Sequence, residues 1–341
     1  MTRESVNVAV LGATGAVGET LLTVLKERNV PIGTLYPLAS ARSAGKTVTF
    51  KGQTLTVLDV AQFDFAKADI GLFSAGGSVS ADYAPKAAQA GCVVIDNTSQ
   101  FRYEKGIPLV VPEVNPEAIS GYKTRNIIAN PNCSTIQMLV ALKPIYDAVG
   151  IERINVATYQ AVSGAGKSAI EALLQQTEAL LKGQEPELNV FSQQIAFNVI
   201  PQIDNFQANG YTREEMKMVW ETQKILADDR IKVNPTAVRV PVLYGHSEAI
   251  SLETSRKITV DEARTILSKA NGIRVLDDVS QALYPLPARE GTGHDTVFVG
   301  RIREDISHPN GLNLWVVADN IRKGAATNAV QIVEILLAKY L

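Results

Sequence analysis

One cysteine stands at the junction of two apolar segments, in the stretch NIIANPNCSTIQML of residues 126–139. The apolar run before it ends at Ala129, and a helical pattern follows Cys133. A thiol at a helix start lies at the positive end of the helix dipole, which lowers its pKa and favours the nucleophilic thiolate. We predict that Cys133 is a nucleophile, against the ordinary alternative of a small buried residue. Cys92, inside the apolar stretch AGCVVID, fits that ordinary alternative.

A thiol nucleophile works with an acid or base, which is most often a histidine. The chain has three histidines. His308 precedes a proline and is typical of a turn, while His294 lies in the loop-like stretch REGTGHDT. His246 follows a strand-like segment that also carries Arg239, so both side chains can face one site. A lone histidine is commonly a surface residue, but this pairing favours His246 as the acid/base.

A glycine-rich turn, GATGAVG, separates the apolar run of residues 6–11 from a helical pattern. Glycines spaced G-x-x-G-x-x-G let a backbone approach a pyrophosphate, and the following helix offers free N–H groups. A plain tight turn is the alternative, but the strand before and the helix after it favour dinucleotide binding. The residues predicted to contact the cofactor here are Gly12, Thr14, Gly15, Ala16 and Val17, together with Ser74 in the small-residue loop after the third strand.

The second strand-like run ends in LASARSAGK, without the carboxylate that binds the ribose of NAD. It offers Ser40, Arg42 and Ser43 instead, and an arginine can bind a 2′-phosphate through two parallel hydrogen bonds. A solvated basic loop is the alternative. Together with the glycine turn, these residues predict NADP.

A second glycine-rich stretch, AVSGAGKS at residues 161–168, nearly matches the phosphate loop of nucleotide hydrolases. An NTPase is therefore a competing hypothesis, although no later apolar strand ends in a suitable magnesium-binding aspartate. The other interpretation is that this loop lies against the reactive end of the dinucleotide. It would then bring Ser163 and Gly164 to the cofactor.

These residues need elements to position them, and the first part of the chain alternates strand and helix patterns. Strand-like segments at 6–11, 34–40, 68–77, 92–99 and 126–132, the last three ending in small-residue or polar loops, predict a parallel α/β sheet with ligand loops at its carboxyl ends. We expect a Rossmann-like NADP-binding domain over residues 1–131.

Later segments combine helical patterns at 165–183 and 212–227 with strand-like runs at 154–164, 236–242, 246–255, 296–305 and 312–320. They predict an α+β catalytic and dimerisation domain with a mixed or antiparallel sheet over residues 132–321. The final helical stretch, within residues 322–341, is assigned to the first domain.

The composition limits the possible partners and location. The chain has 341 residues, 46% of them hydrophobic, and a formal net charge of −2 without a basic block, which argues against nucleic acid. Its apolar runs are too short to span a bilayer, and two cysteines do not form a disulfide framework. We expect a cytoplasmic protein with no membrane segment and no metal site.

Six motifs together resemble the aspartate-β-semialdehyde dehydrogenase family over essentially the whole chain. They are VAVLGATGAVG, NPNCSTIQ, TYQAVSGAGK, TREEMKM, VRVPVLYGHSEA and NIRKGAATNAVQI. The resemblance implies reduction of L-aspartyl-4-phosphate with NADPH to aspartate semialdehyde and phosphate, a step towards lysine, diaminopimelate, threonine and methionine. It also implies a homodimer formed through the second domain. A non-catalytic NADP-binding relative is the remaining alternative.

The resemblance also implies roles for individual residues. Cys133 would be the nucleophile, His246 the acid/base, and Gln160 the residue that orients the acyl-enzyme. Arg239 would bind the substrate α-carboxylate and Glu214 its amino group, although the neighbouring Glu215 is an open alternative. The remaining expected contacts are Arg102, Asn132 and Lys217 for phosphate and Asn320 beside the cofactor.

Overall fold

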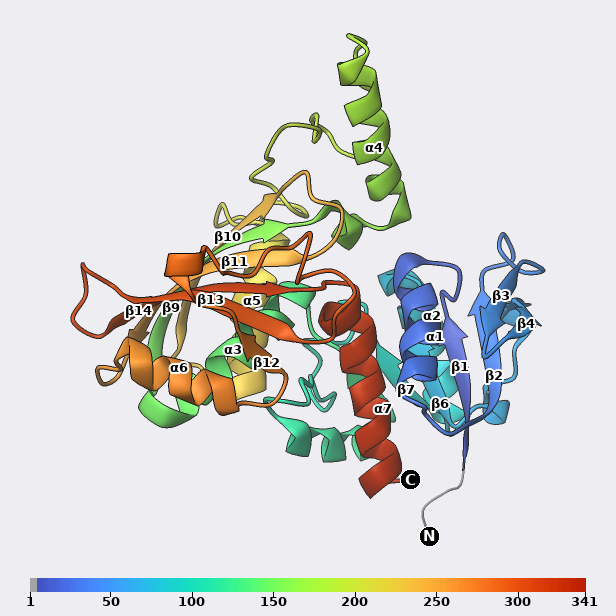
Figure 1. Ribbon diagram of the computed structural model, residues 1–341. Helices are drawn as coiled ribbons and strands as arrows, with labels where there is room; N and C mark the ends of the chain where they lie inside the picture. Colours follow the sequence, from blue (N-terminus) through green and yellow to red (C-terminus); the bar gives the residue numbers. More distant parts are fainter. Residues whose placement is uncertain (1–4) are drawn as a thin grey trace. The chain divides into compact units, whose positions relative to one another are not determined.

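The computed structural model describes residues 5–341 of the chain (Figure 1). It divides into two compact units, one formed by Met1–Asn132 with Ala325–Leu341 and the other by Cys133–Gly324. The breaks after Asn132 and Gly324 fall next to the domain boundaries predicted from the sequence, after residues 131 and 321.

The first unit contains a six-stranded sheet in which every neighbouring pair is parallel. Its strand order is β5 (Leu58–Asp59), β2 (Ile32–Ala39), β1 (Val6–Leu11), β6 (Ile70–Phe73), β7 (Val93–Asp96) and β8 (Ile127–Ala129). From β1 the chain passes first to β2 on one side and later to β6 on the other. This reversal is the topological switch point where open α/β sheets bind ligands.

Three long helices belong to this unit: α1 (Ala16–Glu27), α2 (Gly77–Gln89) and α7 (Thr327–Lys339). The last of them packs against α1, as Figure 1 shows in red and blue, although some 300 residues separate them in sequence. Arg28 at the end of α1 and Glu334 on α7 form two parallel hydrogen bonds of 2.7 Å. The apolar face of this helix buries Val330, Val333 and Leu336 fully and Leu337 partly.

A short hairpin in the first unit was not predicted. Its strands β3 (Thr47–Phe50) and β4 (Gln53–Thr56) pair antiparallel across Lys51 and Gly52. Both turn residues have positive φ angles, as a tight hairpin turn requires. Only four residues form each strand, so their alternation was too short to recognise. Three short 3₁₀ helices, η1 (Val60–Gln62), η2 (Phe65–Lys67) and η3 (Pro116–Thr124), complete this unit.

The second unit contains a six-stranded sheet that is mixed, one of the two arrangements that the sequence predicts. Its strand order is β10 (Lys232–Arg239), β9 (Ile151–Gln160), β11 (His246–Thr254), β14 (Gly311–Ala318), β13 (Val297–Glu304) and β12 (Ile273–Val275). The pairs β9–β10 and β12–β13 are parallel, and the other three are antiparallel. The strands therefore alternate between buried and more exposed side chains instead of being apolar throughout.

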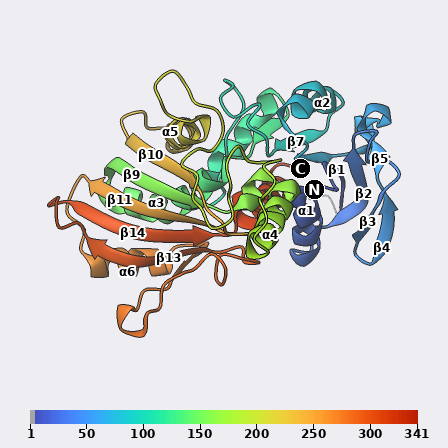
Figure 2. The same cartoon turned by 90° about the horizontal axis from the view of Figure 1, so that it is seen from above.

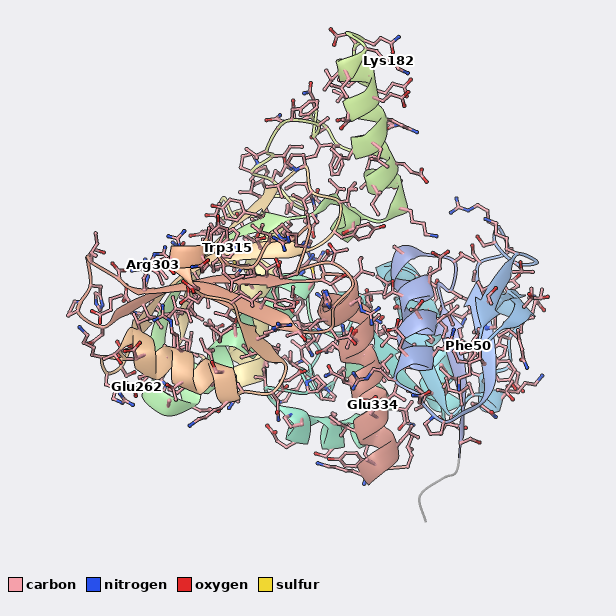
Figure 3. The ribbon with its side chains drawn as sticks, in the orientation of Figure 1. Phe50, Lys182, Glu262, Arg303, Trp315 and Glu334 are labelled. Atoms are coloured by element: carbon pink, nitrogen blue, oxygen red, sulfur yellow. The ribbon has the colours of Figure 1, made fainter. Side chains whose placement is uncertain are left out.

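Helices α3 (Cys133–Val149), α5 (Arg213–Leu226) and α6 (Val260–Lys269) pack on one face of this sheet, and the view in Figure 2 looks onto the other face. Helix α4 (Lys167–Leu181) projects away from the sheet, and Figure 3 shows Lys182 near its far end. Helix α6 was not predicted. The remaining short elements are η4 (Val162–Ala165), η5 (Val279–Gln281) and the π-helical turn Arg322–Ala326. No helix within residues 5–341 is long and apolar enough to cross a membrane.

Candidate active site

The glycine turn of the first unit has the geometry of an anion-binding loop. Gly12 has a φ of +88°, and a Cβ atom on Gly18 would lie 2.0 Å from the Gly12 carbonyl oxygen. Only glycine fits at either position. Glycine is therefore required at both positions, because the start of helix α1 lies very close to the end of strand β1.

Helix α1 begins at Ala16 with no side-chain cap. The N–H groups of Gly12 and Ala13 donate to Leu38 O, but no acceptor within the described residues takes those of Thr14, Ala16, Val17 and Gly18. A helix N-terminus with unused N–H groups binds anions through those donors and the helix dipole. Of the predicted contacts in this turn, Thr14, Ala16 and Val17 have unused N–H groups, whereas those of Gly12 and Gly15 donate to Leu38 O and Gly12 O.

Ser74 lies beside this turn at the switch point of the sheet. A Cβ atom on Gly12 would lie 3.0 Å from Ser74 Oγ, and the Ser74 hydroxyl donates to Leu11 O at 3.2 Å. Because Gly12 has no side chain, the loop at Ser74 can lie close to the glycine turn.

The turn after β2 carries the predicted 2′-phosphate residues. Ser43 N–H donates to Ser40 O at 2.9 Å, which closes the turn. Arg42 is exposed and makes no hydrogen bond or ion pair with any described residue. Because β2 and β1 are parallel neighbours, this turn and the glycine turn lie at the same edge of the sheet. An uncommitted guanidinium at this place suits a phosphate on the ribose.

Arg102 and Asn132, predicted to bind phosphate, also lie in the first unit. Both are buried, and Arg102 Nη2 donates to Asn97 O at 2.9 Å. The turn that leads to Arg102 is held by Asp96, which accepts hydrogen bonds from Ser80 Oγ at 2.8 Å and Thr98 Oγ1 at 2.7 Å. Burial raises the pKa of Asp96, although these hydrogen bonds oppose the shift.

The two cysteines differ as predicted in their surroundings. Cys133 is the first residue of α3 and is partly exposed, whereas Cys92 is fully buried. Burial raises the pKa of the Cys92 thiol to about 12, with a smaller contribution from Asp69. A Cβ atom on Gly324 would lie 2.7 Å from Cys133 Cβ, so Gly324 is required for the present position of the thiol.

His246 begins strand β11 and is completely buried. Its Nδ1 accepts a hydrogen bond from Ala161 N–H at 3.0 Å. A backbone N–H can only donate, so the proton of the neutral imidazole is on Nε2, which has no partner among the described residues. Burial lowers the pKa of His246 to about 3, and the charge of Arg239 adds to this while Glu214 opposes it.

Arg239 ends strand β10 and is almost entirely buried. Its Nη1 donates to Ala161 O at 2.8 Å, but no described carboxylate lies within ion-pair distance. Burial lowers the pKa of Arg239, partly offset by Glu214 and Cys133. Gly164 covers both side chains, since a Cβ atom there would lie 2.9 Å from Arg239 Nη1 and 3.4 Å from His246 Nε2. The structure therefore brings His246 and Arg239 together beside Gly164.

Glu214 connects these groups to Gln160 and Lys217. It accepts from Gln160 Nε2 at 3.3 Å and pairs with Lys217 Nζ at 2.9 Å. Lys217 also pairs with Asp204 at 2.9 Å. Burial alone would lower the pKa of Lys217, but the two carboxylates outweigh it and raise the pKa. Asp204 was missed because nothing distinguishes it in the polar stretch QIDNFQ.

Glu215, the alternative to Glu214, has a different function in the fold. Its Oε2 accepts from Thr212 N–H at 2.6 Å, and its Oε1 accepts from Ala237 N–H at 2.9 Å. The first bond belongs to a capping box at the start of α5. Both oxygens are committed to backbone donors, which leaves Glu214 as the better candidate for a substrate contact.

The stretch AVSGAGKS does not form a phosphate cradle. The N–H groups of Val162, Ser163, Gly164 and Gly166 already donate to protein carbonyl oxygens, and that of Ala161 donates to His246. Ser163 Oγ is instead hydrogen bonded to Asn320, whose Oδ1 accepts from Gly245 N–H at 2.9 Å. Most N–H groups that would line a phosphate loop are thus already used, which does not favour the NTPase hypothesis.

Comparison with known proteins adds independent evidence. The family model described as "Semialdehyde dehydrogenase, NAD binding domain" matches residues 7–122, and "Semialdehyde dehydrogenase, dimerisation domain" matches residues 142–323. An aspartate-semialdehyde dehydrogenase of Legionella pneumophila is 68% identical over 98% of this chain and 96% of its own length.

Solved structures agree. Aspartate semialdehyde dehydrogenase II of Vibrio cholerae, complexed with ASA, is 62% identical with a TM-score of 0.98, covering 99% of this chain and 100% of that chain. The enzyme of Candida albicans, solved with NADP, is 28% identical with a TM-score of 0.77, covering 98% and 99%.

The parallel sheet with its switch point and the match to an NAD-binding family model together define a class of nicotinamide-dependent oxidoreductases. Within that class, this chain belongs to the aspartate-semialdehyde dehydrogenase family. The predicted family, fold class, enzyme class and use of a nicotinamide dinucleotide are thereby confirmed.

Proposed function

We propose that the chain reduces L-aspartyl-4-phosphate with NADPH to L-aspartate 4-semialdehyde and phosphate, through a thioester on Cys133. The reaction leads towards lysine, diaminopimelate, threonine and methionine. The family membership of the chain and the arrangement of its second unit support this proposal.

One observation carries the assignment. Arg239 is a buried cation near Cys133, and no described carboxylate lies within ion-pair distance of it. A charge in such a place is costly unless an anion compensates it. A substrate α-carboxylate is a suitable anion, because the planar guanidinium can donate two parallel hydrogen bonds to it. Glu214 supplies the opposite charge that suits the substrate amino group.

The first unit fits NADP at three places. The unused N–H groups of Thr14, Ala16, Val17 and Gly18 suit the pyrophosphate. The space at Gly12 and Ser74 suits a close approach of the ligand, and Arg42 suits the 2′-phosphate. The bound cofactor supplies a hydride to the acyl carbon. We further propose that Ser163, Gly164 and Asn320 of the second unit contact the cofactor. The relative that was solved with NADP supports this choice over NAD.

In the first chemical step, Cys133 Sγ forms a bond to the acyl carbon and the bond to the phosphate oxygen breaks. The leaving phosphate takes that electron pair and is held by Arg102, Asn132 and Lys217. His246 begins the step with its proton on Nε2, so it serves as the acid of the predicted acid/base. It donates a hydrogen bond to the oxygen on which negative charge develops.

In the second step, hydride addition converts the thioester carbon to a tetrahedral centre. The carbon–sulfur bond then breaks, Cys133 leaves as a thiolate, and the aldehyde forms. Gln160 fits the orienting role, because its side chain is fixed by Thr158 at 3.2 Å and Glu214 at 3.3 Å. The proton consumed overall comes from solvent, which restores the starting state of the site.

We also propose a homodimer formed through the second unit. Large apolar side chains are exposed there, including Leu181, Phe197 and Phe206, as is usual where a partner covers a surface. The family model that covers this unit is described as a dimerisation domain. A cytoplasmic location is also proposed, since a reducing compartment suits a thiol nucleophile.

The test follows NADPH formation from aspartate semialdehyde, phosphate and NADP. Wild type should be active, and Cys133→Ala should lose activity while it still binds NADP. NADP binding without turnover in the wild type would instead favour a non-catalytic relative. Activity in Cys133→Ala would exclude the thioester.

A further inference from the structure

A buried carboxyl group lies behind the proposed catalytic residues and has no role in the mechanism above. Glu248 is completely buried on β11, and neither of its oxygens accepts a hydrogen bond within the described residues. His246 and Glu248 are two residues apart on the strand, so their side chains point to the same face. That face packs against helix α3.

The complete burial of Glu248 and the lack of a hydrogen bond from the described residues to either of its oxygens determine its protonation state. An isolated carboxylate in the interior would be strongly destabilised, so the group remains a neutral acid. Burial accordingly raises the pKa of Glu248 well above its usual range, and the Gln137 side chain opposes this only in part. A neutral acid differs from a carboxylate in that it has an O–H group to donate.

Gln137 is the side chain that faces Glu248 from helix α3. It is fully buried and lies one helical turn beyond Cys133, on the same side of the helix. Gln137 Nε2 donates to the His246 carbonyl oxygen at 3.4 Å. Its Oε1 has no donor among the described residues. The neutral Glu248 acid therefore has an O–H group to donate, and Gln137 Oε1 is an acceptor that receives no hydrogen bond from the described residues.

We propose that Glu248 and Gln137 form a positioning pair, in which the Glu248 O–H fixes the Gln137 amide and that amide holds strand β11 against helix α3. His246 begins this strand and Cys133 begins this helix. The pair thus sets the position of the imidazole relative to the thiol without touching substrate. Small displacements of such groups are costly to catalysis. The inference rests on the proposed function, because it concerns the rate of that reaction.

Two substitutions of Glu248 separate a neutral donor from a charge. Glu248→Gln keeps the shape and an N–H donor, so kcat should stay within about threefold of wild type. Glu248→Leu keeps an apolar side chain of similar size without a donor. It should lower kcat by about tenfold or more, while KM and the Kd for NADP stay within about twofold. Equal losses in both variants would overturn the neutral-donor assignment.

The coupling between the two residues distinguishes positioning from general packing. Gln137→Leu should lower kcat at least as much as Glu248→Leu, and the double variant should match Gln137→Leu alone. Tm should change by less than about 4 °C in Glu248→Leu, since an apolar group replaces an unpaired polar one. Additive losses, or losses that follow Tm, would overturn the pair. An inactive wild type would refute the proposed function instead.

Discussion

Two glycine-rich loops follow strands in this chain, and they use their backbone N–H groups differently. In the first unit, the turn at Gly12 to Gly18 leaves four N–H groups without an acceptor in the described part of the chain. In the second unit, the loop at Ala161 to Gly166 uses five N–H groups within the protein, and one of them donates to His246. The first loop can therefore receive a phosphate, whereas the second supports and covers Arg239 and His246, which we propose face the substrate.

The comparison shows what a glycine pattern does and does not determine. Both stretches supply backbone that can approach a neighbour closely, at Gly12 and Gly18 in the first loop and at Gly164 in the second. In the first loop, Gly12 lies close to Ser74, and Gly18 lies close to the backbone of the same loop. In the second loop, Gly164 lies close to Arg239 and His246. Free N–H groups, not glycines as such, mark the anion site.

The largest expected effect concerns Arg239, whose guanidinium donates to Ala161 O in the second loop. Lysine keeps the charge but cannot form two parallel hydrogen bonds to a carboxylate. Arg239→Lys should lower kcat/KM for aspartate semialdehyde by roughly tenfold to a thousandfold. Steady-state kinetics would measure this, with the Kd for NADP and Tm as controls that should hardly change. Activity within about twofold of wild type, or a fall in Tm sufficient to explain the loss, would argue against this role.

The second loop can also be tested through its own residues. A methyl group at Gly164 would press on Arg239 Nη1 and on the His246 ring, so Gly164→Ala should lower kcat/KM by about a hundredfold. Lys167→Ala is the matched control, because a true phosphate loop would require that lysine. Its side chain is exposed, and its removal should change kcat/KM by less than about threefold. The opposite order of effects would restore the phosphate-loop interpretation.

In the first unit, Arg42 should determine the choice between NADP and NAD. Arg42→Ala should raise KM for NADP by about tenfold to a hundredfold, as expected for lost hydrogen bonds to a charged group. KM for NAD should stay nearly constant, because NAD has no 2′-phosphate. Lys46→Ala removes a charge from the same loop and should affect both cofactors little. Equal effects of Arg42→Ala on NADP and NAD would remove Arg42 from this role.

The hydrogen bond from Ala161 to His246 predicts a modest effect of pH on stability. Since the pKa of His246 falls from 6.5 to about 3 on folding, the unfolded chain binds the proton first as pH decreases. The histidine should therefore cost about 1.4 kcal/mol of stability for each pH unit below 6.5, down to about 3, and nothing above 6.5. Urea unfolding of wild type and His246→Gln at pH near 7.5 and 5.5 gives the difference. A wild type that gained stability relative to the variant at the lower pH would contradict the neutral imidazole.

The sequence predicted the parts of the fold that have strong local patterns. The strands of the first sheet are short, continuous apolar runs, and α4, α5 and α7 have clear helical periodicity. Helix α6, the β3–β4 hairpin and the strands β5 and β12 were missed. All are short: α6 has ten residues, each hairpin strand four, β5 two and β12 three.

The candidate site shows a similar limit. Cys133, His246 and Arg239 could be proposed from their types and neighbours in sequence. The sequence could not show that Ala161 holds His246 in one tautomer, or that Asp204 shares Lys217 with Glu214. It also could not show that both oxygens of Glu215 are used by the backbone. These facts depend on which strand ends meet, and that is a property of the sheet rather than of any local pattern.

The most direct test of the account is to trap the acyl group on Cys133. Wild type is mixed with aspartate semialdehyde and NADP without phosphate, quenched in acid, and analysed by intact-protein and peptide mass spectrometry. We predict one acyl group per chain, located on Cys133, formed together with one equivalent of NADPH and discharged when phosphate is added. NADPH formation without an adduct, or an adduct on Cys92, would contradict the thioester mechanism.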